Sequence, residues 1–216
     1  MNKLFWVITG VLLCSKLMAS ELSVQVLDNK HQPLSNIVVE LVPSEKSDSD
    51  LSLPVSANMK QLDQKFVPHI LAISKGTQVH FPDSDSVRHH VYSFSEAKTF
   101  EIAIYKEEVK RRIEFEQAGV VELGCNIHDW MLGYIYVAES PLFQQTAPGG
   151  LSRFSELPNG RYTIKVWHPR IALGDIQTLH EIDIESHTQN VVIRLKEDLR
   201  PSLDDFDSVH AFSEYD

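Results

Sequence analysis

One short segment contains the residue types of a redox-metal site. Cys125, His128 and Met131 follow one another as Cys-x2-His-x2-Met at the end of an apolar run. A thiolate, an imidazole and a weak thioether are three of the four ligands of a blue-copper centre, and the fourth is a second imidazole. Hydrolytic zinc sites use His, Glu and Asp around an open water position and have little use for a thioether. The segment therefore predicts a copper site for electron transfer.

The second imidazole has two candidates in the upstream segment 86–92, namely His89 and His90. In an extended segment neighbouring side chains point to opposite faces, so one of the two can face the metal. Either choice gives the copper four protein ligands and leaves no open position for a substrate. We therefore expect an electron carrier and not an enzyme.

Other residues with chemical potential fit structural roles better. His69, His80 and His168 lie outside the ligand spacing, and Asp83 and Asp85 lack the bidentate Glu of a calcium loop, so the two aspartates are expected to form turns. Trp130 and Trp167 are expected to pack in the interior. Trp130 has the alternative of bordering an electron-exit surface around His128.

Residues 1–19 are typical of a secretory signal peptide. A short positive start containing Lys3 precedes an apolar run from Leu4 to Cys14 and an exit of small residues. The run is shorter than the ~20 residues of a membrane-spanning helix. We expect export to the periplasm and no membrane span in the mature chain.

Removal of residues 1–19 narrows the role of the remaining thiol. Cys14 is lost, which leaves Cys125 as the single cysteine and excludes an intramolecular disulfide. A lone thiol in an oxidising compartment is a liability unless it is buried or metal-bound.

Loss of Lys3 and Lys16 with the signal peptide moves the formal net charge from −10 to −12. This acidic balance argues against a nucleic-acid ligand and favours either a basic protein partner or simple solubility.

The elements that must position these residues are short strands. Alternating or β-branched runs separated by turn residues predict an all-β chain of sandwich type. The predicted strands are residues 22–27, 37–42, 65–73, 77–81, 90–94, 100–105, 112–115, 120–123, 134–137, 162–167, 182–184 and 191–195. A helical turn is expected over 107–112, an exposed linker over 46–58, and a disordered acidic tail over 197–216.

Residues 59–139 resemble cupredoxins. The Cys-x2-His-x2-Met spacing is similar to that of amicyanin. The segment from Lys75 to Asp85, followed by His89-His90-Val91, resembles the cupredoxin pattern G-x-x-V-x-F/W-x-N-x-D…H-N-V. The closer resemblance is to plastocyanin-like methylamine utilisation proteins, which share sequence motifs such as R-H-H-V-Y-S-F and C-N-I-H-D-W-M. It implies a cupredoxin Greek-key sandwich with one type 1 copper. The first residue of H-N-V is the family's ligand, so the implied set is His89, Cys125, His128 and Met131.

This sequence departs from the cupredoxin pattern at two positions beside the ligands. His90 stands where cupredoxins usually have an Asn that ties the two ligand loops together by hydrogen bonds. Asn126 stands in place of the usual Ser or Thr after the cysteine. Both departures are expected to affect the reduction potential and colour of the centre more than copper binding itself.

The flanking segments resemble a different family. Residues 24–39 and 156–162 look like parts of a carboxypeptidase-regulatory-like β-sandwich, a non-catalytic module. The resemblance implies that residues 20–45 and 140–196 form one small sandwich into which the cupredoxin domain, 59–139, is inserted.

These observations predict a protein that carries single electrons between redox partners. A basic c-type cytochrome or a dehydrogenase is the expected kind of partner. Two alternatives stay open: a periplasmic copper-binding protein for metal handling or sensing, and a non-redox interaction scaffold.

Overall fold

The computed structural model describes residues 20–45, 56–104, 112–171, 177–185 and 187–202. In these residues the secondary structure is β, with no α-helix, which confirms the all-β prediction. No helix in the described ranges is long and apolar enough to cross a membrane. The predicted signal peptide, residues 107–111 of the expected helical turn, and residues 203–216 of the predicted tail lie outside these ranges.

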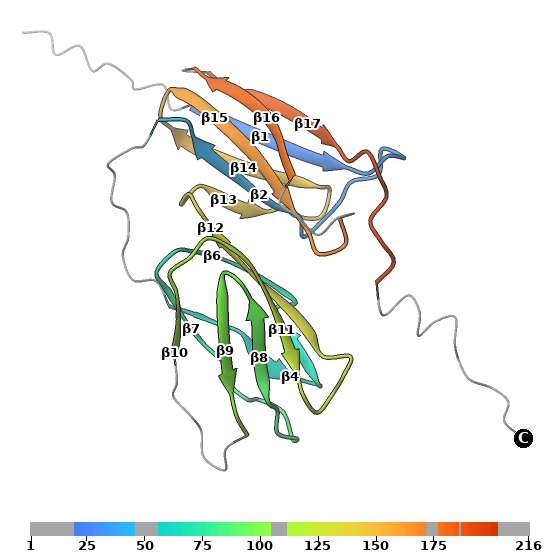
Figure 1. Cartoon of the computed structure of the whole chain (residues 1–216). Helices are drawn as coiled ribbons and strands as arrows, with labels where there is room; N and C mark the ends of the chain where they lie inside the picture. Colours follow the sequence, from blue (N-terminus) through green and yellow to red (C-terminus); the bar gives the residue numbers. More distant parts are fainter. Residues whose placement is uncertain (1–19, 46–55, 105–111, 172–176, 186, 203–216) are drawn as a thin grey trace, which may run out of the picture.

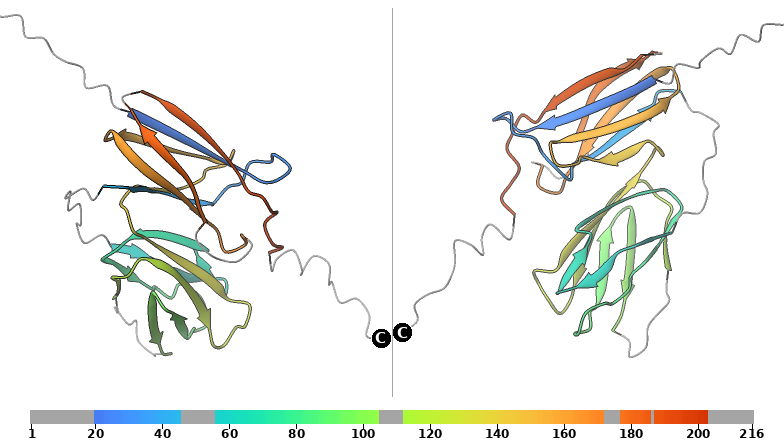
Figure 2. Two further views of the ribbon diagram at one scale, coloured as in Figure 1. Left: turned by 45° about the horizontal axis from the view of Figure 1, so that its top comes forward. Right: turned by 180° about the vertical axis from the view of Figure 1, so that it is seen from behind.

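One sandwich is built from the two ends of the described chain and is called the flanking sandwich here. Its sheets have the strand orders β14-β1-β17 and β13-β2-β15-β16. The strands are β1 (Ser20–Leu27), β2 (Val38–Pro43), β13 (Phe143–Gln145), β14 (Leu151–Leu157), β15 (Gly160–Trp167), β16 (Gln177–Ile184) and β17 (Gln189–Arg194). Strand β1 pairs antiparallel with β14 and parallel with β17. Segments far apart in the sequence therefore lie side by side (Figures 1 and 2).

Alternation along β1 explains how this sandwich forms. Leu22, Val24 and Val26 are fully buried, while Ser23 and Gln25 between them are half-buried. Their side chains share a core with residues such as Ile164 and Val166 of β15. Burial of one face of each sheet provides the main stabilisation.

The intervening strands form a second sandwich, called the central sandwich. Its sheets have the orders β10-β7-β3 and β6-β12-β11-β8-β9, with a hairpin β4-β5 beside them. The strands are β3 (Ser56–Asn58), β4 (Lys60–Leu62), β5 (Lys65–Val67), β6 (Ile70–Ser74), β7 (Thr77–His80), β8 (Val91–Ser95), β9 (Lys98–Ile102), β10 (Arg112–Phe115), β11 (Gly119–Cys125) and β12 (Leu132–Ala138). Buried residues from both sheets, including Val79 and Leu123, form its core.

Several strand predictions need correction, and β4 and β13 were not predicted at all. Residues 56–58 of the predicted linker form β3, which pairs parallel with β7. The run 65–73 is divided into β5 and β6 around Pro68, which has no N–H to donate to a ladder. Strand β14 was not predicted, because its buried face includes Ser152 and interrupts the apolar pattern.

The two sandwiches meet through a small third core. Val38 and Trp167 of the flanking sandwich pack with Ile70, Tyr136 and Ala138 of the central one. In Figure 1 this contact lies where β12 leads into β13.

A buried polar contact crosses the same interface. The Tyr136 hydroxyl donates to Oε2 of Glu40 at 2.6 Å, and the Ser140 N–H donates to Oε1 at 2.7 Å. Glu40 is only 1% exposed. Burial, followed by the charge of Glu40, raises the pKa of Tyr136 above its usual range. The hydroxyl is therefore a permanent donor, and the carboxylate has partners on both oxygens.

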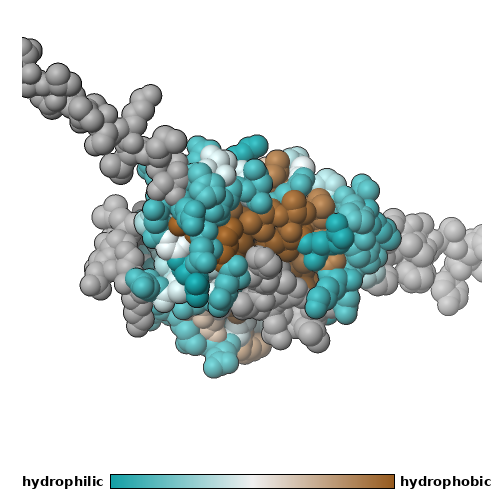
Figure 3. All heavy atoms as spheres, turned by 90° about the horizontal axis from the view of Figure 1, so that it is seen from above, coloured by the Kyte–Doolittle hydropathy of each residue, from teal (hydrophilic) through white to brown (hydrophobic). Residues whose placement is uncertain are grey.

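The outer surface of the flanking sandwich includes apolar groups. Seen from above, hydrophobic residues form a band on this face (Figure 3). Val192 of β17 is 59% exposed, although most of its strand neighbours are polar or turned inward.

Candidate metal centre

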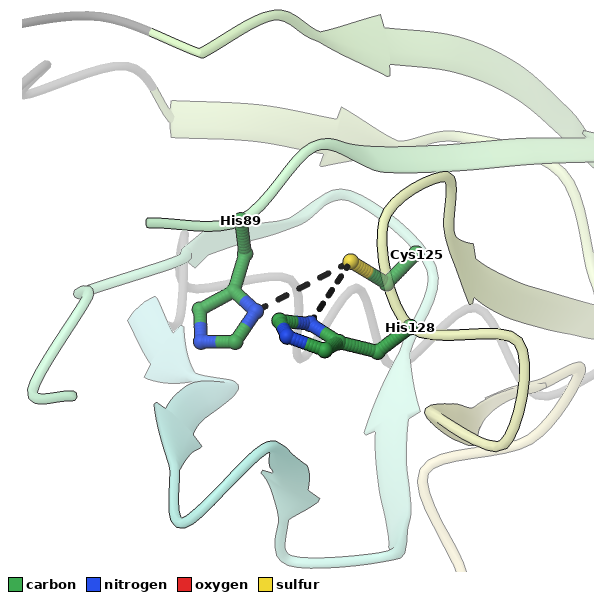
Figure 4. A group of neighbouring side chains, drawn as sticks. All are labelled: His89, Cys125 and His128. Carbon is green, nitrogen blue, oxygen red and sulfur yellow. Dashed lines mark hydrogen bonds between the residues drawn. The ribbon is translucent and has the colours of Figure 1, made fainter. Parts of the chain in front are cut away.

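His89, Cys125 and His128 converge at one end of the central sandwich. The Cys125 Sγ lies 3.7 Å from Nδ1 of His89 and 3.7 Å from Nδ1 of His128. The two imidazole rings are 5.0 Å apart between centroids. One ligand atom from each residue lies within 4.8 Å of the other two. Figure 4 shows the three side chains pointing toward one another.

Pairing of β8 with β11 explains why these residues meet. Cys125, the last residue of β11, is in register with Val91, the first residue of β8. The segment just before β8 and the loop just after β11 therefore lie at the same end of the sheet. His89 lies in the first of these and His128 in the second.

His89 and His90 have separate environments, as expected for neighbours in an extended segment. His89 is 5% exposed and faces Cys125. The His90 ring lies on the other side, with Nε2 2.7 Å from Oε1 of Glu101 in β9. The structure thus places His89, and not His90, in the cluster.

Burial differs among the four predicted ligands. Cys125 is 3% exposed and Met131 1%, and both belong to the same core. The Met131 N–H donates to the His128 carbonyl at 3.0 Å, which closes a tight turn between the two residues. His128 itself is half-buried. Its side of the cluster is therefore the one that solvent can approach.

A carboxylate lies behind His89 on the side away from Cys125. Nε2 of His89 is 3.1 Å from Oδ2 of Asp85, and this oxygen also accepts the Gln64 N–H at 2.6 Å. Oδ1 of Asp85 accepts the Ser86 N–H at 2.7 Å. The Gln64 N–H is the largest influence that holds the pKa of Asp85 below its usual range, with smaller contributions from Ser86 and His89.

The sequence predicts a turn at Asp85, which also falls at the D of the cupredoxin pattern, and it gives no signal at Gln64. The turn is real, since the Asp85 N–H donates to Oδ1 of Asp83 at 3.1 Å. The place of Asp85 in that pattern and its position four residues before His89 were the available signals. Gln64 contributes a backbone group, which no side-chain pattern can reveal.

The surface beside the cluster carries exposed apolar residues. The Trp130 ring lies 5.4 Å from the His128 ring, and Trp130 is 59% exposed. Ile127 is 47% exposed and Val87 40%. The expectation that Trp130 packs in the interior was therefore wrong, because the turn after β11 directs it outward. Trp167 is 1% exposed and packs as expected.

The donor set suits copper. A thiolate and two imidazoles are the equatorial ligands of a blue-copper centre, and Met131 supplies a buried thioether residue on the same loop. The carboxylate of Asp85 contacts the backbone N–H groups of Gln64 and Ser86 and the Nε2 of His89. It lies on the side of the His89 ring away from Cys125 and is therefore not a ligand candidate. The described residues therefore fit a soft, redox-active ion better than a hard oxygen-preferring one.

No family model matches this sequence, and no curated protein matches it. Several solved copper proteins resemble part of the structure. A purple cupredoxin from Nitrosopumilus maritimus is 23% identical with a TM-score of 0.33, over 39% of this chain and 99% of that protein. An amicyanin variant is 15% identical with a TM-score of 0.35, over 46% of this chain and 99% of that one.

A copper-containing nitrite reductase from Thermus scotoductus is also similar, at 27% identity and a TM-score of 0.36. This match covers 45% of the chain and only 25% of the reductase. All three similarities are partial and distant, so a copper site in this protein has to be inferred from its own His89, Cys125 and His128.

Proposed function

We propose that this protein is a cupredoxin-type electron carrier with one type 1 copper. The observation that carries the proposal is the position of the Cys125 thiol, 3.7 Å from one nitrogen of each of two imidazoles. His89, Cys125 and His128 would hold the ion, with Met131 as the fourth, weaker ligand. Copper bound there supplies one-electron chemistry by changing between Cu(I) and Cu(II).

The protein's own residues supply rigidity and exclusion of water. His89, Cys125 and Met131 are each no more than 5% exposed. Backbone pairing of β8 with β11 holds the two ligand-bearing segments at a set distance. A site preorganised in this way changes little when an electron arrives, which keeps electron transfer fast.

The half-buried His128 is the proposed point of electron entry and exit. Trp130, Ile127 and Val87, close in sequence to the two histidines, offer exposed apolar surface for a transient partner. The acidic net charge of the chain favours a basic partner, such as a c-type cytochrome, or a dehydrogenase.

Location and finer family membership are part of the proposal. The N-terminal pattern supports export to the periplasm. The motif R-H-H-V-Y-S-F and the ligand loop support the methylamine utilisation type of cupredoxin. Pairing of β1 with both β14 and β17 supports a single flanking module of the carboxypeptidase-regulatory-like kind, interrupted by the copper domain.

One observation favours a second function, copper handling. His128 is half-buried, so a chelator or a metal-accepting protein can reach one ligand. In that function the protein would exchange the ion, whereas an electron carrier retains it.

Voltammetry combined with a chelator challenge separates the two functions. The protein is loaded with one equivalent of Cu(II) and adsorbed on an electrode. An electron carrier gives a reversible one-electron wave and keeps its copper during many cycles with a chelator in solution. Loss of copper to the chelator with no reversible wave would favour metal handling. Asp83→Asn is a matched control, since it alters the same end of the sandwich without touching a ligand.

A further inference from the structure

The hairpin β4-β5 connects to His89 through Asp85. Its turn contains Asp63 and Gln64, both with positive φ, at 52° and 56°. This conformation directs the Gln64 N–H at Oδ2 of Asp85, at 2.6 Å. The same oxygen is 3.1 Å from Nε2 of His89. One carboxylate oxygen thus joins the hairpin to a predicted metal ligand.

Backbone hydrogen bonds fix the hairpin against the loop that contains Asp85. The Gln61 N–H donates to the Pro82 carbonyl at 3.0 Å, and the Ser84 N–H donates back to the Gln61 carbonyl at 2.9 Å. The buried Gln61 amide also donates to the Phe81 carbonyl at 3.3 Å. The turn and the carboxylate therefore belong to one rigid unit.

Phe66 of β5 anchors the same hairpin on the ligand-bearing sheet. A Cβ built on Gly133 of β12 would lie 2.6 Å from the Phe66 Cβ, so only glycine allows this approach. Phe66 is 2% exposed. Because β12 follows directly after Met131, the hairpin packs beside the strand that ends the ligand loop.

The two oxygens of Asp85 contact different groups. Oδ1 accepts the Ser86 N–H of its own loop, whereas Oδ2 faces His89 and Gln64. The Asp85 side chain is 8% exposed and that of His89 0%. A carboxylate only accepts hydrogen bonds, so its contact with Nε2 requires a ring proton there, and in the neutral imidazole Nδ1 then keeps its lone pair. Nδ1 is the nitrogen that faces Cys125.

We propose that Asp85, held by the hairpin β4-β5, is a positioning residue that fixes the tautomer of His89 and favours Cu(II) over Cu(I) at this site. The inference rests on the proposed copper function. A hydrogen-bonded carboxylate makes the imidazole a stronger donor, and its negative charge stabilises the more positive oxidation state. The hairpin thereby contributes to the reduction potential without contacting the metal.

The first measurement uses the metal-free protein and does not depend on copper. Imidazole ¹⁵N and ¹H NMR at constant pH reports which nitrogen of His89 carries the proton. The wild type is expected to show a slowly exchanging Nε2–H, and Asp85→Asn a mixture of tautomers. Asp83→Asn removes the same charge from the same loop without contacting His89, and is expected to match the wild type. A wild-type His89 protonated on Nδ1 alone would overturn the proposal even if Asp85→Asn does not fold.

The second measurement compares copper affinities in the same three proteins. Loss of a carboxylate that is hydrogen-bonded to a metal-binding histidine weakens metal binding about 10–100-fold. Asp85→Asn is expected to lose this factor for Cu(II) with little change for Cu(I), which raises the potential by about 59 mV per tenfold. Asp85→Glu, which keeps the charge, should recover part of the loss. Equal affinities and potentials for Asp85→Asn and Asp83→Asn would overturn the proposal. Absence of copper binding in the wild type would instead refute the proposed function, while the tautomer result would still stand.

Discussion

The backbone N–H of Asn126 donates a hydrogen bond to the carbonyl oxygen of His90 at 3.2 Å. This contact ties the loop containing His128 to the segment containing His89. Donor and acceptor are both main-chain groups, so the contact does not depend on an Asn side chain at position 90. The His90 side chain is free to approach Glu101 instead, with Nε2 at 2.7 Å from the carboxylate.

Two asparagine substitutions test this division of roles. His90→Asn is expected to keep copper and its visible colour, because the backbone contact and all four proposed ligands remain. His89→Asn removes a ligand and should weaken Cu(II) binding by more than the ~100-fold that loss of an outer partner costs. Competition titration with a chelator measures both. A stronger loss in His90→Asn than in His89→Asn would reverse the assignment.

Substitution of Met131, the proposed fourth ligand, should change the reduction potential more than the fold. Met131→Leu conserves side-chain volume in a site that is 1% exposed, so the expected loss of stability is below about 1.5 kcal/mol. The variant should still bind copper, with a higher reduction potential, because a donor that stabilises Cu(II) is lost. Voltammetry of the two proteins makes the comparison. An unchanged potential would remove Met131 from the ligand set.

The contact between the sandwiches should contribute measurably to stability. Tyr136→Phe removes the donor to the buried Glu40 carboxylate, and a hydrogen bond to a charged group contributes about 1.5–3 kcal/mol. Tyr162→Phe is the matched control, because that hydroxyl donates to the neutral Pro158 carbonyl within one sandwich. Its expected cost is about 0.5–1.5 kcal/mol. Urea unfolding of the metal-free proteins gives both values, and a larger cost for Tyr162→Phe would contradict the assignment.

Stability should fall in mild acid because of His168. Burial, followed by the charges of Arg170 and His69, lowers its pKa from 6.5 to about 4. The unfolded chain therefore binds a proton that the folded protein excludes. The associated stability is fully present above pH 6.5 and is lost as the pH falls toward 4. Over this range the free energy of unfolding should drop by about 3 kcal/mol.

Variants of two histidines isolate this contribution. His168→Gln should have a flatter dependence of unfolding free energy on pH between 6.5 and 4. His187→Gln makes the same change at a side chain that is 57% exposed, and is the control for the substitution itself. Parallel pH curves for the wild type and His168→Gln would exclude His168 as the source.

Features with a local signature were predictable from the sequence. The alternation of Leu22, Val24 and Val26 marks β1, and the spacing of Cys125, His128 and Met131 marks one loop. Features that depend on pairing with distant segments were not. Strand β3 exists because its exposed residues find β7 as a partner, and Asp85 acquires its role only where the Gln64 N–H and the His89 ring meet.

Absorption and EPR spectra of the protein with one equivalent of Cu(II) test the central claim most directly. The convergence of His89, Cys125 and His128 predicts an intense visible Cu–thiolate band and narrow hyperfine splitting. Cys125→Ser should lose the band while its far-UV circular dichroism stays that of a β protein. A colourless wild type with an ordinary Cu(II) signal, or a band that persists in Cys125→Ser, would contradict the assignment of a thiolate-copper centre.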